Sequence, residues 1–158
     1  MSNQRKGAAA TDTNLGVYVT KTLASLATAD VFTVKGDVEI TLLYGVVTGV
    51  GDGGATTIKF RAKTNAVDMS AATTVTGDTV GEVYIFTGDA AVIIGGTGSV
   101  PVKSIAGVLS AFPHNPMIFS GGASDTIELV QTGDDATHAV RWVLFYVPLT
   151  PGATVTAA

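Results

Sequence analysis

Two histidines and the acidic residues near them have the greatest chemical potential in this sequence. His114 lies in a proline-flanked stretch, and His138 opens the last apolar segment, with Asp134 and Asp135 before it and Asp125 further upstream. An imidazole and carboxylates that converge can bind a metal ion or share a proton. Two histidines are too few for a three-histidine zinc site, however, and the chain has no cysteine for thiolate ligands. We therefore expect neither a metal site nor a cofactor.

Two further motifs have the form of catalytic or cofactor-binding elements. Residues 49–54, GVGDGG, match the G-x-G-x-x-G spacing of dinucleotide-binding loops. Such a loop must open a helix, whereas the following TTIKFRAK alternates with the period of a strand, so a hairpin turn is the better explanation. Ser124 and Asp125 lie in GGASD, which is not a nucleophile elbow. The sequence predicts that the protein is not an enzyme.

A basic stripe is formed by Lys59, Arg61 and Lys63 at alternate positions. A row of cations on one strand face can follow a phosphate backbone. No aromatic residues are interleaved with these cations for base stacking, and the chain has 9 Lys+Arg against 13 Asp+Glu, a net charge of -4. We therefore interpret the stripe as the solvated face of a strand and expect no nucleic-acid partner.

The elements that must position these residues are strands. Thr, Ala, Val and the 19 Gly dominate the chain, while the residues that usually cover a helix surface are scarce. The 158 residues suit one all-β domain, a β-sandwich or a jelly-roll-like barrel of about seven to nine strands. We expect strands at 17–22, 31–35, 37–50, 56–63, 81–87, 90–94, 126–131 and 138–147.

The clearest pattern predicts a long hairpin between segments 37–50 and 56–63. Both segments place apolar side chains at even-numbered positions, so paired residues that share a face require a loop of odd length. A loop of Gly51, Asp52 and Gly53, with Gly53 left-handed, meets this requirement. The resulting register sets Tyr44 opposite Phe60 in the core and Glu39 diagonal to Lys63 outside.

The ends of the chain are expected to extend from the single β domain at 17–147. We predict an N-terminal arm at 1–16 and, because of its two prolines, an extended C-terminal tail at 148–158 that stops the sheet. The strand at 138–147 is apolar on both faces, which is typical of a central strand or of one beneath a subunit interface. The start of the chain shows no apolar signal segment, and prolines interrupt the uncharged stretch 104–124. We expect synthesis in the cytoplasm and no membrane partner.

Three segments together resemble the head decoration (cement) proteins of tailed bacteriophages. They are the polar arm MSNQRKGAAATDTN, the strand pair ITLLYGVVTGVGDGGATTIKF and the ending VRWVLFYVPLTPGATV. The resemblance implies a virion structural protein on the capsid surface, often a homotrimer, which clamps neighbouring subunits of the major capsid protein. On this hypothesis the partner-binding residues are Arg5, Lys6, Phe112, His114, Asn115 and Phe145.

Two other functions are compatible with the sequence. The first is a glycan- or receptor-binding β domain of a phage fibre or tail, with the aromatic-bearing stretch AFPHNPMIF as its loop site. The second is a small jelly-roll coat protein whose basic arm binds the genome. Arg5 and Lys6 are too few cations to favour that second alternative.

Overall fold

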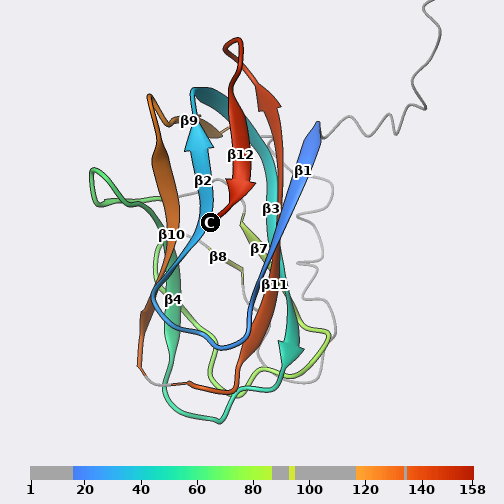
Figure 1. Cartoon of the computed structure of the whole chain (residues 1–158). Coiled ribbons are helices and arrows are strands. Elements are labelled where there is room, and N and C mark those ends of the chain that lie inside the picture. Colours follow the sequence, from blue (N-terminus) through green and yellow to red (C-terminus); the bar gives the residue numbers. More distant parts are fainter. Residues whose placement is uncertain (1–15, 87–92, 95–116, 134) are drawn as a thin grey trace, which may run out of the picture.

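A computed structural model describes residues 16–86, 93–94, 117–133 and 135–158, and these form an all-β fold of two antiparallel sheets. The first sheet has the strand order β1-β11-β3-β7-β8, with β9 also pairing β3, and the second has the order β12-β2-β10-β4-β5, with β6 also pairing β4. Figure 1 shows the first sheet toward the right and the second toward the left. The first sheet comprises β1 Val17–Leu23, β3 Asp37–Gly49, β7 Val83–Phe86, β8 Ile93–Ile94, β9 Met117–Ser120 and β11 Ala139–Pro148. The second comprises β2 Ala29–Lys35, β4 Thr57–Ala62, β5 Val67–Asp68, β6 Thr73–Thr74, β10 Asp125–Thr132 and β12 Thr154–Ala157.

The predicted all-β class is confirmed, and the architecture is that of a β-sandwich. The strands expected at 17–22, 31–35, 126–131 and 138–147 are present as β1, β2, β10 and β11. In the described residues each sheet has six strands, which is more in total than the sequence predicted, because β5, β6, β9 and β12 are too short to show a clear alternation. The strand expected at 90–94 lies mostly outside the described residues.

The predicted hairpin is wrong, because β3 and β4 belong to different sheets. β3 pairs with β11, β7 and β9, whereas β4 pairs with β10, β5 and β6. Gly53 does have the expected left-handed conformation, with φ of 85°, but its loop crosses from one sheet to the other. Tyr44 is therefore not opposite Phe60, and its pairing partners are Val143 and Ile85.

A β-bulge at Thr41 divides β3 into two parts with opposite orientations. Phe145 of β11 pairs with Leu42 and Tyr146 pairs with Ile40, so Thr41 is an extra residue. Before the bulge, the buried side chains are at even-numbered positions, as predicted. After it, Leu43 and Val47 face the core, and Leu42 and Tyr44 face outward. The even-numbered pattern predicts Tyr44 in the core only for a strand without a bulge, so that prediction is wrong.

The predicted C-terminal tail instead contributes strand β12 to the edge of the second sheet. Thr154–Ala157 pairs with β2, and Val155 is buried between two exposed threonines. The prolines of this segment precede the strand, so they do not interrupt its pairing. The Lys21 ammonium donates a hydrogen bond to the Ala158 carbonyl, which joins this edge to β1 of the first sheet.

The core lies between the sheets and centres on aromatic rings from both. Trp142 of β11 and Phe60 of β4 meet edge to face, with ring centroids 4.8 Å apart and planes at 84°. Tyr84 of β7 packs beside Trp142 at 6.0 Å. All three side chains are buried. This cluster holds the two sheets at a fixed separation.

Candidate functional site

The outer face of the first sheet is largely apolar, although it points away from the core. Residues in register across β1, β11, β3 and β7 share this face, because side chains alternate along each strand. We call it the sheet-one face. Its residues are Tyr18, Thr20, Thr22, Glu39, Leu42, Tyr44, Val46, Val83, Ile85, Arg141, Val143, Phe145 and Val147.

A groove of about 850 Å³ lies in the sheet-one face. Val143 forms its floor and is 5% exposed, with Thr20 of β1 and Tyr44 of β3 on either side in register. The rings of Tyr18 and Phe145 close one end, with centroids 5.6 Å apart. Arg141 lies at the other end, two residues from Val143 on β11. The groove exists because the shorter side chains of Thr20 and Val143 lie among the longer ones of Tyr18, Tyr44, Arg141 and Phe145.

Only one of the predicted partner-binding residues can be placed in the structure. Phe145 is half-buried and lines the groove. Arg5, Lys6, Phe112, His114 and Asn115 lie outside the described residues.

Sequence reasoning missed the other main groove residues, Tyr18, Tyr44 and Arg141. The apolar residues on both faces of β11 predicted a central strand or one beneath an interface, and β11 lies between β1 and β3. The position of Tyr44 depends on the bulge at Thr41, for which the sequence gives no signal.

The basic stripe of β4 lies on the outer face of the second sheet and is neutralised. The Lys59 ammonium is 2.7 Å from an Asp68 carboxylate oxygen. Arg61 donates from Nε and Nη2 to Oε2 of Glu128, the residue directly opposite it on β10. The Lys63 ammonium donates hydrogen bonds to both carboxylate oxygens of Asp30. The predicted diagonal contact with Glu39 is wrong, because β3 and β4 belong to different sheets.

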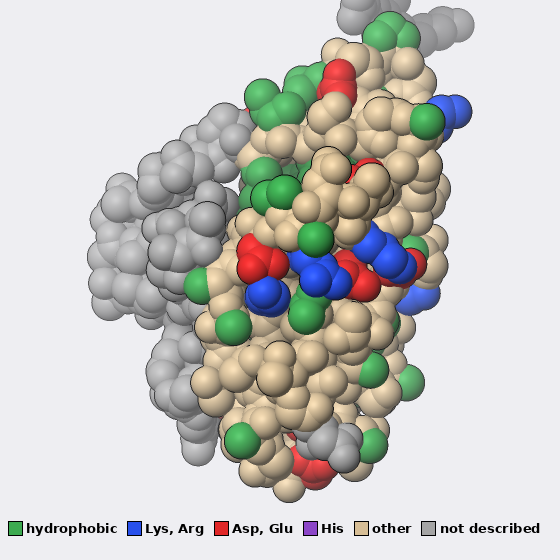
Figure 2. All heavy atoms as spheres, turned by 90° about the vertical axis from the view of Figure 1, so that its left-hand side faces the viewer, with side chains coloured by type: hydrophobic (Ala, Val, Ile, Leu, Met, Phe, Trp, Pro, Cys, Tyr) green, Lys and Arg blue, Asp and Glu red, His purple; other side chains and the backbone are tan. Residues whose placement is uncertain are grey.

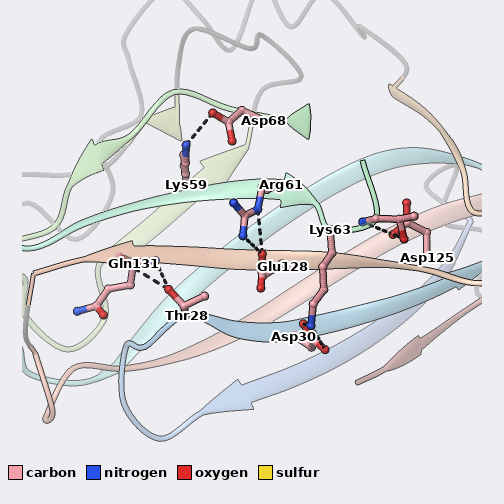
Figure 3. A network of polar contacts seen from close by, with 10 residues as sticks. Thr28, Asp30, Lys59, Arg61, Lys63, Asp68, Asp125, Glu128 and Gln131 are labelled. Atoms are coloured by element: carbon pink, nitrogen blue, oxygen red, sulfur yellow. Dashed lines mark hydrogen bonds and ion pairs between the residues drawn. The ribbon is translucent and has the colours of Figure 1, made fainter. Parts of the chain in front are cut away.

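Figure 3 shows these three pairs side by side, and Figure 2 shows charges of both signs in one band across this face. Each cation of the stripe therefore already has a carboxylate partner. The second sheet presents paired charges, in contrast to the apolar sheet-one face.

His138 belongs to a buried polar network at one end of the sandwich. Its Nδ1 is 3.5 Å from Asp135 Oδ2, and its Nε2 is 3.0 Å from the Tyr84 hydroxyl. That hydroxyl donates to Asp78 Oδ2 at 2.7 Å. All four side chains are at most 2% exposed, so a substrate has no access to the imidazole in this arrangement.

The metal-binding alternative considered for the histidines gains no support in the described part of the chain. Asp135 is next to His138, but Asp125 instead accepts hydrogen bonds from the Thr64 backbone and hydroxyl. Within the described ranges, no three His, Asp or Glu side chains are arranged to hold a metal ion. His114 and Asp134 lie outside these ranges.

We expect the protein to lose stability on both sides of neutral pH. Burial lowers the pKa of His138 against the opposing effect of Asp135, and burial together with the Asp78 hydrogen bond raises the pKa of Tyr84. Below about pH 6.5 the unfolded state binds the histidine proton more readily, and above about pH 10 it releases the tyrosine proton more readily. The free energy of unfolding should therefore fall in both ranges.

Denaturant unfolding of the wild type and of His138→Gln tests the acid limb. We expect the wild type to be less stable at about pH 5.5 than at about pH 7.5, and the variant to show a smaller difference. Equal pH dependence in the two proteins would contradict the assignment to His138.

The chain was also compared with known proteins. No protein-family model, curated protein or solved structure matches it. In the part of the chain that the structure describes, no helix has the length and apolar character needed to cross a membrane.

Proposed function

We propose that this protein is a structural component of a virion that decorates the capsid and binds neighbouring coat subunits through the sheet-one face. The observation that carries the proposal is the apolar outer face of a sheet whose other face already forms the core. An antiparallel sheet in a monomer usually presents a polar outer face to water, and contiguous apolar patches mark interaction sites. A partner protein would remove this surface from water.

The arrangement of the face supports a protein partner. Apolar side chains extend over β11, β3 and β7, and the aromatic rings of Tyr18, Tyr44 and Phe145 gather around the groove. Tyrosine, phenylalanine and arginine are enriched at the centres of protein interfaces. The resemblance to phage decoration proteins favours the major capsid protein as that partner, with copies of this chain arranged as a homotrimer on the capsid surface.

Copy number in purified particles tests the proposed role. Particles from the source of this chain are isolated by sedimentation, and the chain is quantified against the main shell protein by mass spectrometry. We expect about one copy per coat subunit or a simple fraction of it, as symmetric decoration requires. A few copies per particle would indicate a fibre or tail component, and absence would exclude a virion role.

A variant tests whether the sheet-one face makes the contact. Val143→Arg places a long charged side chain on the floor of the groove and should abolish binding to shells stripped of this protein. Lys35→Gln removes an exposed charge at the end of β2 in the other sheet and should leave binding unchanged. Circular dichroism checks that both variants fold. Normal binding by Val143→Arg would exclude this face as the contact.

A further inference from the structure

Among the described residues, Arg141 is the one cation on the sheet-one face, and its side chain has no ion-pair or hydrogen-bond partner there. Its side chain is exposed at the end of the groove, surrounded by Thr22 and Val46 on the neighbouring strands. Within the described ranges it makes neither an ion pair nor a side-chain hydrogen bond. The contrast with Lys59, Arg61 and Lys63, which all have carboxylate partners, makes Arg141 available to a ligand.

We propose that the groove binds an extended segment of the partner protein in which an acidic side chain is followed or preceded by apolar ones. This inference rests on the proposed function, since it names what the sheet-one face recognises. The guanidinium of Arg141 pairs with the carboxylate, because its planar donors match the two carboxylate oxygens. The apolar side chains of the segment fill the groove over Val143 and contact Phe145.

The dimensions of the groove define the spacing of that segment. Arg141 and Phe145 are four residues apart on β11, which corresponds to about 13 Å along a strand. An extended partner segment covers the same length in four residues, and its alternate side chains point to one side. The pattern expected in the partner is therefore an acidic residue, an apolar residue two positions away and an aromatic or large apolar residue four positions away, in either chain direction.

The chemistry of the groove favours a protein segment over an acidic sugar. A sugar needs hydrogen-bond partners for several hydroxyl groups, and the side chains in the groove that offer them are Thr20, Arg141 and the two tyrosines. The apolar surface also continues beyond the groove to Val83 and Ile85, further than one or two sugar rings extend. An acidic segment that continues onto this surface uses both features.

Binding of Arg141→Gln to stripped shells tests the inference. We expect its affinity to be about 10- to 100-fold weaker than that of the wild type, because the partner's carboxylate would be left without a counter-charge. Lys35→Gln changes the net charge of the chain by the same amount, so it controls for long-range electrostatics and should bind like the wild type. Arg141→Lys should restore part of the affinity, since it keeps the charge but not the planar donors.

The outcomes separate this inference from the proposed function. If Val143→Arg abolishes binding while Arg141→Gln binds normally, the docking face stands and the carboxylate inference is overturned. If the wild type itself fails to bind shells, the proposed function fails and the inference falls with it. Normal shell binding by Arg141→Gln, together with glucuronate-induced NMR shifts at Tyr18 and Arg141 in the wild type, would assign the groove to an acidic sugar instead.

Discussion

Replacing Trp142 with alanine is expected to lower the free energy of unfolding by about 3–5 kcal/mol. The indole is 1% exposed and contacts Phe60 edge to face and Tyr84 at its side, so its removal leaves a cavity between the sheets. Gly45, its pairing partner on β3, provides the space that the ring fills, because a Cβ there would lie 2.6 Å from the indole. The gap cannot close without moving both sheets.

Chemical and thermal denaturation of the wild type, Trp142→Ala and Arg141→Gln measure this effect. Trp142→Ala should show the full loss in free energy of unfolding and a melting temperature lower by about 10 °C. Arg141→Gln, on the adjacent residue that points outward, should change stability by less than about 0.5 kcal/mol. A loss below about 1 kcal/mol for Trp142→Ala would mean that the indole is not part of the core.

Replacing Asp135 with alanine is expected to cost about 3 kcal/mol. Oδ1 of this buried carboxylate accepts hydrogen bonds from the backbone N–H groups of His138 at 2.9 Å, Thr137 at 3.2 Å and Asp52 at 3.3 Å. The first two belong to the turn before β11, and Asp52 belongs to the loop that crosses between the sheets. Alanine would leave these three donors without their acceptor.

Asp135→Asn is the matched control, because it keeps an oxygen that can accept the three hydrogen bonds. Oδ2 makes no hydrogen bond among the described residues and lies 3.5 Å from His138 Nδ1, so its replacement by an amide nitrogen breaks no hydrogen bond. We expect less than half of the loss seen with alanine when both variants are unfolded in denaturant. Equal losses would show that the charge of Asp135, rather than its acceptor role, stabilises this end of the sandwich.

The candidate site could be predicted only in part. The apolar residues on both faces of β11 predicted a central strand or one beneath a subunit interface, and β11 lies between β1 and β3 with Phe145 on its outward side. Alternation alone predicts that Tyr44 lies in the core. The bulge at Thr41, which turns Tyr44 outward, arises from the pairing of β3 with β11 and leaves no signal in the sequence. The sequence could not show that Arg61 has a carboxylate partner and that Arg141 has none among the described residues. Glu128 is distant from Arg61 in the sequence, and the two side chains meet only because β10 and β4 are paired.

By itself the sequence determined the all-β class and the position of most long strands, because alternation with period 2 is a property of each segment alone. The tertiary structure decided which strands are neighbours. β3 and β4 have the pattern of a hairpin, but each pairs with strands far along the chain. The segment at 154–157 forms an edge strand of the second sheet, although the prolines before it predicted the end of a sheet. Pairing between distant segments depends on how both sheets bury their apolar faces together, and no local pattern contains that information.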